Sequence, residues 1–499
     1  MLDWNPGPPS TAAGPCCGSK GPHSLVVSVD NPWAPGESLH FYKCIDCHSL
    51  IVPDGAFHDY SDAEPAQVSW RHYVQLGAGI DVMVNPAERA RTPTASRLLD
   101  VGCGFGFTLD YWQHAVEGEA VGVEPSAFGR LGAKMLGVNL HVALLADVPS
   151  LQARQFDVVL SSEVIEHVPD PAAFVRELQR YLAPGGTLVL TTPNAGFVTQ
   201  DVPLGLVLAT LSPGLHKLLL SQAALERLLG NAGFAHVRVD GAGQQLVAWA
   251  SDRPLLLQDD PAALRSSYAA YLGRRWADPS IGLDLRLGFG YRFFKDLVNG
   301  GRLDEAVPVA AGLQALIQKH YNFDFTDAAA VLGAVLPTAQ LDDYMAAAPF
   351  SLGPILFFRA IAAAQGALPG EDAAAGFALA HEVLMQSIRV RPDHFQEAAL
   401  LVWAALLEQA GAVLRAGQTE AAASCLARIA TAETAPPADC PSRVPADVAQ
   451  RALALAHEVK LALNPPTSPP IPLPSPQKPR GLSALWQHLR PSKGKQRTS

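Results

Sequence analysis

The sequence predicts an α/β fold, a doubly wound and mostly parallel sheet, followed by a mainly α-helical C-terminal domain. Three observations carry this prediction. An apolar strand runs into a glycine-rich turn at residues 97–106. The acidic residue Glu124 ends a second apolar stretch, at about the spacing from the turn that doubly wound folds use for a ribose-binding carboxylate. From about residue 254 onward, alanine and leucine recur at helical spacing.

The glycines of the turn are Gly102, Gly104 and Gly106. Glycine permits a tight turn and lets the backbone approach a ligand closely. A dinucleotide site has the pattern G-x-G-x-x-G, with the pyrophosphate on the helix N-terminus. Phe107 stands where the third glycine of that pattern belongs. The loop therefore favours a nucleoside ligand without a pyrophosphate, with a plain strand-to-helix turn as the alternative.

Four segments with strand and turn character follow one another at a spacing that suits alternating strands and helices. They are residues 98–106, 120–126, 155–168 and 182–194. This order resembles the class I S-adenosylmethionine-dependent methyltransferases, which include small-molecule O- and C-methyltransferases. The resemblance covers about residues 96–240 and implies a Rossmann-like methyltransferase sheet that binds S-adenosyl-L-methionine.

The resemblance implies roles for several residues beside the glycine turn. Asp100 would lie near the ammonium group of the methionine part, and an acidic group also suits a cationic sulfonium ligand. The backbone at Gly102 and Gly104 would contact the amino-acid part. Glu124 would accept hydrogen bonds from the ribose hydroxyls, with a solvated carboxylate at a strand end as the alternative.

Two more cofactor-binding residues are expected farther along the sheet. A third strand is expected at residues 141–145, and by resemblance Asp147 after it would accept a hydrogen bond from the adenine amino group. The alternative is an ordinary loop aspartate. Ser162 ends the expected fourth strand, and carboxyl ends of strands are where open α/β sheets bind ligands.

The segment after the fourth strand contains Glu166 and His167. It lacks the Asn- or Asp-Pro-Pro-aromatic run with which amino-group methylases of DNA polarise an exocyclic amine, which disfavours methylation of nucleic-acid bases. His167 is a candidate for proton transfer, and a structural role beside the helix that begins at residues 169–171 is its alternative.

Methyl transfer requires alignment of nucleophile, methyl and sulfur and the exclusion of water. A hydroxyl acceptor also needs a general base, and histidine suits neutral pH. His216 is the stronger candidate because it precedes a helix with Ser221 as its expected N-cap, a layout that resembles the late substrate-side element of the family. Its alternative role is a hydrogen bond to the loop backbone.

The N-terminal cysteines resemble a zinc ribbon, which many relatives carry before the methyltransferase domain. Cys44 and Cys47 form one C-x-x-C knuckle, whereas Gly14 stands where a second knuckle ending at Cys17 would need a cysteine. Because the adjacent Cys16 and Cys17 rarely bind one zinc together, the expected ligands are Cys17, Cys44 and Cys47, with His48 or His23 as the fourth. A degenerate ribbon without metal and a redox pair are the alternatives.

Composition limits the class of protein. The chain has 499 residues, 48% hydrophobic and 17% charged residues and a formal net charge of −10, which argues against nucleic acid as a partner. Its seven cysteines lack paired spacing, so a cytoplasmic location is expected. No targeting segment is visible, and the apolar stretch 202–220 is too interrupted for a transmembrane segment.

The expected domains are a zinc-ribbon-like segment at 1–60, the methyltransferase domain at 61–250, a helical domain at 251–463, and a proline-rich linker with a basic tail at 464–499. Within the helical domain, residues 291–306 and 412–422 both have the pattern of helix, glycine turn and helix. They resemble tetratricopeptide-like hairpins, but no steady period is visible, so a helical bundle is expected. Before the first strand, Tyr60 and Tyr73 are expected either to line a lid or to belong to a helix on the sheet.

Together these features predict a cytoplasmic methyltransferase that moves a methyl group from S-adenosyl-L-methionine to a small molecule or sugar. The acceptor atom is oxygen first and carbon second, in glycan or secondary-metabolite biosynthesis. The helical domain would bind a protein partner, select the substrate or form a dimer. The alternatives are a protein methyltransferase and a non-catalytic scaffold whose helical domain docks a partner.

Overall fold

The computed structural model describes residues 2–53, 64–92, 97–202, 204–241, 243–392, 394–435, 437 and 442–463. These residues form two compact units. Unit 1 contains the residues up to Pro65 together with Gly79–Tyr271, and unit 2 contains Ala66–Ala78 and the residues from Leu272 onward. Tyr60 and the expected linker and tail at 464–499 lie outside the described residues.

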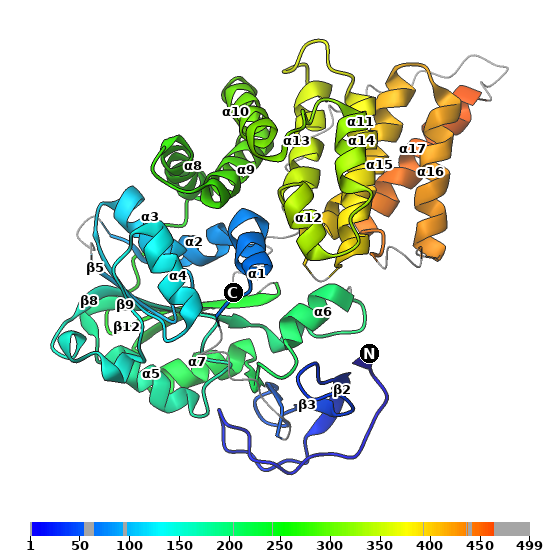
Figure 1. The fold of residues 1–499 in the computed structure, drawn as a ribbon. Helices are drawn as coiled ribbons and strands as arrows, with labels where there is room; N and C mark the ends of the chain where they lie inside the picture. The colour runs from blue at the N-terminus through cyan, green and yellow to red at the C-terminus, as the bar shows by residue number, and fades with distance from the viewer. Residues whose placement is uncertain are drawn as a thin grey trace, which may run out of the picture. The chain divides into compact units, whose positions relative to one another are not determined.

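Unit 1 is built around a seven-stranded sheet (Figure 1). In spatial order its strands are β11 (His236–Asp240), β12 (Gln245–Ser251), β9 (Leu182–Pro193), β8 (Phe156–Ser162), β5 (Arg97–Val101), β6 (Glu119–Val123) and β7 (Leu140–His141). The five strands from β9 to β7 are parallel, and β12 is antiparallel to β9 and β11. This mostly parallel sheet and the helical C-terminal region confirm the predicted fold class.

The first strand of this sheet, β5, lies between β6 and β8. The strand order therefore reverses at β5, because β6 continues the chain on one side and β8 on the other. In open α/β sheets the crevice at such a reversal, outside the carboxyl ends of the strands, is where ligands bind. Leu99, Val121 and Val159 are fully buried on these strands, as parallel strands covered on both faces require.

The third strand is shorter than the sequence predicts. β7 ends at His141, and the chain then turns, with the Ala143 amide donating to the His141 carbonyl at 3.0 Å. The 3-10 turn η3 (Leu145–Asp147) follows. The apolar residues at 141–145 predicted a longer strand, and this was wrong because the side chains of Val142 and Leu144 are exposed and do not lie in the sheet.

The helical segments of unit 1 begin where the sequence provides caps. Ser126, Asp170 and Ser221 each accept a hydrogen bond from the backbone amide three residues later, which confirms the predicted N-cap at Ser221. The segments are α2 (Ile80–Ala90), α3 (Phe107–Tyr111), η2 (Trp112–Val116), α4 (Ala127–Leu136), η4 (Pro149–Leu151), α5 (Pro171–Gln179), η5 (Ala195–Phe197), α6 (Leu204–Leu211) and α7 (Gln222–Asn231).

A second sheet joins the N-terminal segment to the rest of unit 1. Its strands are antiparallel, in the order β1 (Leu2–Asp3), β2 (Ser24–Asp30), β3 (Ser38–Lys43), β4 (Leu50–Ile51) and β10 (Leu218–Leu219). β10 lies directly after His216 and Lys217, so the N-terminal segment pairs with the chain that carries a candidate catalytic histidine. The Val52 amide continues this pairing by donating to the Lys217 carbonyl at 3.2 Å.

Unit 2 is helical. Its helices are α1 (Gln67–His72), η1 (Tyr73–Gly77), α9 (Leu283–Asn299), α10 (Leu303–Tyr321), α11 (Ala328–Val335), α12 (Leu341–Ala347), α13 (Leu352–Ala364), α14 (Ala373–Val390), α15 (Gln396–Arg415), α16 (Thr419–Thr434) and α17 (Ala446–Leu463). The helix α8 (Pro261–Ala277) contains the border between the units. Gly300 and Gly301 separate α9 from α10, and Gly417 separates α15 from α16, as the sequence predicts.

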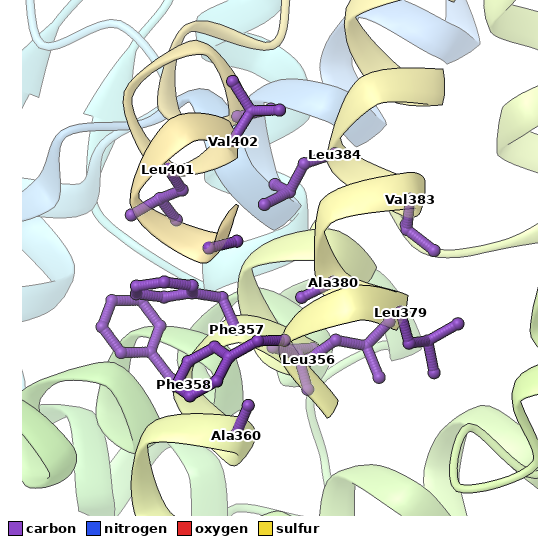
Figure 2. Packing of buried hydrophobic residues seen from close by; sticks show 14 of the residues in the cluster. Leu356, Phe357, Phe358, Ala360, Leu379, Ala380, Val383, Leu384, Leu401 and Val402 are labelled. Atoms are coloured by element: carbon purple, nitrogen blue, oxygen red, sulfur yellow. The ribbon is translucent and has the colours of Figure 1, made fainter. Parts of the chain in front are cut away.

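Successive helices of unit 2 pack against one another from α13 to α17 (Figure 1). Figure 2 shows the core between α13, α14 and α15, where Phe357, Leu384 and Val402 are almost fully buried. The helix α15 is long and apolar enough to cross a membrane, and the bent pair of α12 and α13 passes the same test, but most of α15 is buried in this core. A core helix has the same composition, so this is weak support for a membrane span.

The segment Ala66–Ala78, which the sequence analysis assigned to the sheet domain, belongs to unit 2. The buried Arg292 of α9 holds it by donating to the carbonyls of Val74, Leu76 and Ala78 at 2.9, 3.1 and 2.7 Å. The Gln75 side chain adds hydrogen bonds to Asp284 and to the Phe350 amide. The segment is therefore fixed by polar groups that its own pattern does not reveal.

We expect Arg292→Met to lower the free energy of unfolding of unit 2 by about 3 kcal/mol, because several buried carbonyls lose their donor. Urea denaturation followed by circular dichroism measures this loss. The matched control is Arg302→Met, which removes an exposed pair with Glu305 and should cost less than about 0.5 kcal/mol. Equal effects of the two substitutions would contradict the role assigned to Arg292.

Candidate functional site

The glycine turn after β5 is closed on one side and open on another. Gly102, Gly104 and Gly106 have φ values of +75°, +52° and +91°, which side chains disfavour. A Cβ atom at Gly102 would lie 2.3 Å from Cγ2 of Val164, so the segment after β8 packs directly on the turn. A Cβ atom at Gly104 would meet nothing within 4 Å. The backbone of the turn therefore borders an open space beside the ends of β5 and β8.

Glu124, the residue after β6, is held rigidly beside this turn. Its Oε2 accepts from the Gly104 amide at 3.1 Å, and its Oε1 accepts from the Ser126 amide at 3.0 Å. Each carboxylate oxygen has a further lone pair, since an ionised carboxylate accepts about four hydrogen bonds. Glu124 can therefore accept from a pair of hydroxyls without moving.

Asp100, at the end of β5, is 2% exposed, and its Oδ1 has no hydrogen-bond partner in the described part of the chain. Burial, with the charge of Glu124 as a smaller cause, raises the pKa of its carboxyl to about 8. A buried carboxyl oxygen without a partner is costly. A cationic ligand group at this position would supply the missing partner and favour the ionised form.

The other two predicted cofactor residues have different surroundings. Asp147 is exposed in η3, on the loop after β7. The Thr191 hydroxyl of β9 donates to Glu163 at 3.0 Å, so the Ser162 hydroxyl, 2.7 Å from that of Thr191, is the donor of their hydrogen bond. The Ser162 oxygen can therefore still accept hydrogen bonds, but its hydrogen is already donated to Thr191 at the edge of the sheet.

The two candidate catalytic histidines lie together. The rings of His167 and His216 are 4.8 Å apart between centroids, at 74°. Their Nε2 atoms lie 3.7 and 3.9 Å from Oε1 of Glu166. Their Nδ1 atoms donate to the carbonyls of Leu215 and Thr210, each at 3.0 Å. The backbone hydrogen bond foreseen as the alternative for His216 is thus present, and its other nitrogen still faces a carboxyl group.

Burial controls the charges of this cluster. Burial, together with the nearby His167, lowers the pKa of His216 to about 3, and burial lowers the pKa of His167 as well. Burial and the charge of Glu163 raise the pKa of the Glu166 carboxyl well above its ordinary value. Both imidazoles are therefore neutral near pH 7, with a lone pair on each Nε2.

The Sγ atoms of Cys16, Cys17 and Cys47 all lie within 4.8 Å of one another in unit 1, and that of Cys44 adjoins this group beside Cys17. The Sγ atoms of Cys16 and Cys47 are 3.3 Å apart, and those of Cys17 and Cys44 are 3.5 Å apart. Hydrogen bonding from Cys16 lowers the pKa of Cys47 to about 4. Four sulfurs around one zinc ion lie roughly 3.8 Å apart, so the spacing of the cluster resembles that of a thiolate metal site.

The cluster differs from the expected ligand set in its fourth member. Cys16, set aside because it adjoins Cys17, lies within the cluster. His23, one of the two expected alternatives, has its ring occupied by backbone groups: Nε2 donates to the carbonyls of Ala12 and Ser19, and Nδ1 accepts from the Ile45 amide. The other alternative, His48, is exposed. A tight turn, in which the amides of Cys17 and Gly18 donate to the Gly14 carbonyl, brings both adjacent cysteines to the group and explains the difference.

Sequence reasoning missed the polar residues at the end of β9. Thr192 donates its hydroxyl to Oε2 of Glu166 at 2.9 Å and is fully buried. The side chain of Asn194 holds the carbonyls of residues 241 and 243 and accepts from the Gly196 amide. The signal was the group of polar residues Thr191, Thr192 and Asn194 at the carboxyl end of an apolar strand, next to the strand that precedes Glu166.

This geometry agrees with the comparisons with known proteins. A family model described as a methyltransferase domain matches residues 71–239. The ubiquinone biosynthesis O-methyltransferase of Psychrobacter arcticus is 31% identical over 202 residues, which are 38% of this chain and 77% of that protein. The chain belongs to the methyltransferase family.

Other relatives match shorter parts of this methyltransferase. The enzyme of the same name from Xanthomonas axonopodis pv. citri is 34% identical over 30% of this chain and 66% of its own length. The chain spans about half the length of further relatives, from Bradyrhizobium and Acinetobacter baumannii. The structure of an O-methyltransferase family protein from Burkholderia thailandensis gives a TM-score of 0.27 at 15% identity, over 37% of this chain and 55% of that one.

S-adenosyl-L-methionine is the cofactor of this family, and the residues of the edge fit it. Asp100 offers an unpartnered carboxyl oxygen for a cationic group, and Glu124 offers two fixed oxygens for ribose hydroxyls. The backbone of Gly104 borders open space, where the amino-acid part of the cofactor would lie. When bound, the cofactor supplies an activated methyl group on a sulfonium.

We expect Gly104→Ala to weaken binding of S-adenosyl-L-methionine at least about tenfold, because the new methyl group fills space that the ligand approaches. Isothermal titration calorimetry measures the affinity. Gly137→Ala is the matched control: Gly137 also has a positive φ and open surroundings, but it ends α4 away from the turn. Similar weakening in both variants would show that strain, and not contact with the cofactor, is responsible.

Proposed function

We propose that this methyltransferase transfers the methyl group of S-adenosyl-L-methionine to a hydroxyl oxygen of a small molecule. The observation that carries the proposal is the cluster of Glu166, His167 and His216 at the sheet edge that also bears the glycine turn. Val164, two residues before Glu166, is in van der Waals range of Gly102. A cluster able to manage the proton of a hydroxyl therefore adjoins the cofactor turn.

In this mechanism the protein orients the two reactants and excludes water from them, because the sulfonium of the cofactor is already reactive. Glu124, Asp100 and the glycine backbone hold the cofactor, which fixes the direction in which its methyl group is offered. Transfer to a hydroxyl would form a carbon–oxygen bond, break the carbon–sulfur bond of the cofactor and release the hydroxyl proton. The neutral imidazoles of His167 and His216, beside a buried carboxyl group, are the groups placed to assist that loss.

Similarity supports oxygen as the acceptor atom. The relatives from Psychrobacter and Xanthomonas are named ubiquinone biosynthesis O-methyltransferases. The finer proposals, a sugar or another small acceptor in glycan or secondary-metabolite biosynthesis and a partner that binds unit 2, extend beyond the matched region. The described cysteines are free thiols, which supports a reducing compartment, the cytoplasm.

Incubation with S-adenosyl-L-methionine that carries a radioactive methyl group tests the proposal. We expect label in the small-molecule fraction of a cell extract, and a screen of hydroxylated aromatics and sugars should give a base-stable methyl ether. His216→Gln should reduce turnover at least about a hundredfold and leave cofactor affinity unchanged. Label confined to a protein band would instead support a protein methyltransferase.

We also propose that Cys16, Cys17, Cys44 and Cys47 hold a structural zinc ion. The close sulfur atoms support this, since zinc binds thiolates. The site would brace the catalytic segment, because the Cys47 carbonyl accepts from the Ser221 hydroxyl at 2.5 Å, and Ser221 follows β10 and His216. Zinc would therefore contribute to stability and positioning, with no part in the chemistry.

Metal analysis of the purified protein should find about one thiolate-bound zinc per chain, and Cys47→Ser should abolish it. Cobalt replacement gives a direct reading, because thiolate ligands produce intense near-ultraviolet absorption. The matched control is Cys425→Ser, a buried thiol of α16, which should leave the metal content unchanged. Unaltered zinc in the Cys47 variant, or none in the wild type, would refute the site.

A further inference from the structure

The loop that carries His216 has a strained backbone. It follows α6, and its residues Ser212 and Gly214 have φ values of +39° and +80°. A positive φ is unfavourable for serine, which has a side chain. The amides of Leu215 and His216 both donate to the Ser212 carbonyl, at 3.0 and 3.1 Å. Because such a backbone persists only where the surrounding structure holds it, the contacts around the loop determine where His216 lies.

The N-terminal segment provides one of these contacts. A Cβ atom at Gly214 would lie 2.3 Å from Cδ1 of Trp33 and 2.9 Å from Oδ1 of Asn31. Both residues belong to the turn between β2 and β3. The indole ring of Trp33 therefore lies directly against the backbone of the loop, two residues before His216, and leaves no space for a side chain at position 214.

The turn that bears Trp33 is held by its own hydrogen bonds and by a core beneath it. Asn31 is 2% exposed, and its Oδ1 accepts from the Trp33 amide at 3.0 Å. The Asn31 amide donates to the Glu37 carbonyl at 2.9 Å, which closes the turn. The strands on either side share a hydrophobic core with α6, in which Val29 and Leu211 are almost fully buried. Trp33 thus reaches the loop from a fixed support.

The same N-terminal segment also holds the chain after His216. The Val52 amide donates to the Lys217 carbonyl at 3.2 Å, and the Lys217 amide donates to the Glu166 carbonyl at 3.0 Å. The ring of His216 donates from Nδ1 to the Thr210 carbonyl, at 3.0 Å. His216 is thus fixed on both sides, and a displacement of the loop would break the hydrogen bond of its ring.

We propose that Trp33 is a positioning residue for His216. Trp33 is 48% exposed, whereas a tryptophan that serves the core alone is usually buried to a greater extent. Its ring covers the loop instead, and its removal would leave the strained backbone without that support. The inference rests on the proposed function, in which His216 assists the loss of the hydroxyl proton. A base must meet its hydroxyl within hydrogen-bond range, so a loop displaced by about 1 Å would slow transfer by up to roughly a hundredfold.

Nuclear magnetic resonance of the full-length protein with nitrogen-15 in its histidines tests the position of His216 without an acceptor. Near neutral pH we expect wild-type His216 to show one protonated and one unprotonated ring nitrogen, because the Thr210 carbonyl selects the tautomer with hydrogen on Nδ1. Absence of these signals in His216→Gln assigns them. In Trp33→Ala the ring should exchange between tautomers, and in Trp33→Phe, which keeps a flat ring, the fixed tautomer should return.

Methyl transfer and cofactor affinity are measured on the same samples. Transfer of labelled methyl to the small-molecule fraction of a cell extract should fall at least about tenfold in Trp33→Ala, with affinity for S-adenosyl-L-methionine within about twofold of the wild type. The matched control is Leu256→Ala, an exposed apolar side chain of unit 1, which should change neither the signals nor the transfer. Gly214→Ala presses on the same contact from the other side and should alter the same signals, which tests the contact even where Trp33→Ala has lost cofactor binding.

The two readouts separate the outcomes. Unchanged His216 signals in Trp33→Ala and Gly214→Ala, or transfer at the wild-type rate by Trp33→Ala, would overturn the positioning role and leave the proposed function standing. Equal effects of Leu256→Ala would overturn that role as well. Altered His216 signals in the variants of a protein whose wild type transfers no methyl group would instead remove the proposed function and leave the placement of the ring by Trp33 standing.

Discussion

The parallel pairing of β5 with β6 and β8 is the constraint on which the site depends. Parallel strands end at one edge, so Asp100, Glu124 and the segment after β8 meet there although more than sixty residues separate the first from the last. The left-handed backbone of the glycine turn lets Val164 pack against Gly102 and keeps the space at Gly104 open. The cofactor residues and the histidine cluster are consequences of this arrangement.

The edge gathers carboxyl groups that lack cations of their own. Asp100 and Glu166 are buried, and each has an oxygen without a hydrogen-bond partner in the described residues. A bound ligand is one way in which a folded protein satisfies such a group. The sulfonium and ammonium groups of the cofactor would supply a cationic partner for Asp100. The Thr192 hydroxyl and the two neutral imidazoles surround the carboxyl group of Glu166. The cofactor residues and the groups that can assist loss of a hydroxyl proton therefore lie along one edge of the sheet.

Much of this was predictable from local sequence. The glycine turn, Glu124, the Ser221 cap and the helix–glycine–helix hairpins depend on residues close together in the chain, where backbone geometry leaves few choices. The two-residue β7, the inclusion of Cys16 and the contact of both histidines with Glu166 depend on packing between distant segments. The same holds for Ala66–Ala78, because the carbonyls that fix it find their donor on Arg292, far along the chain.

A crystal structure with S-adenosylhomocysteine tests the central claim most directly. The account predicts ribose hydroxyls on Glu124 and the amino group near Asp100. A nucleoside bound elsewhere on the sheet, or an amino group bound away from Asp100, would contradict the account.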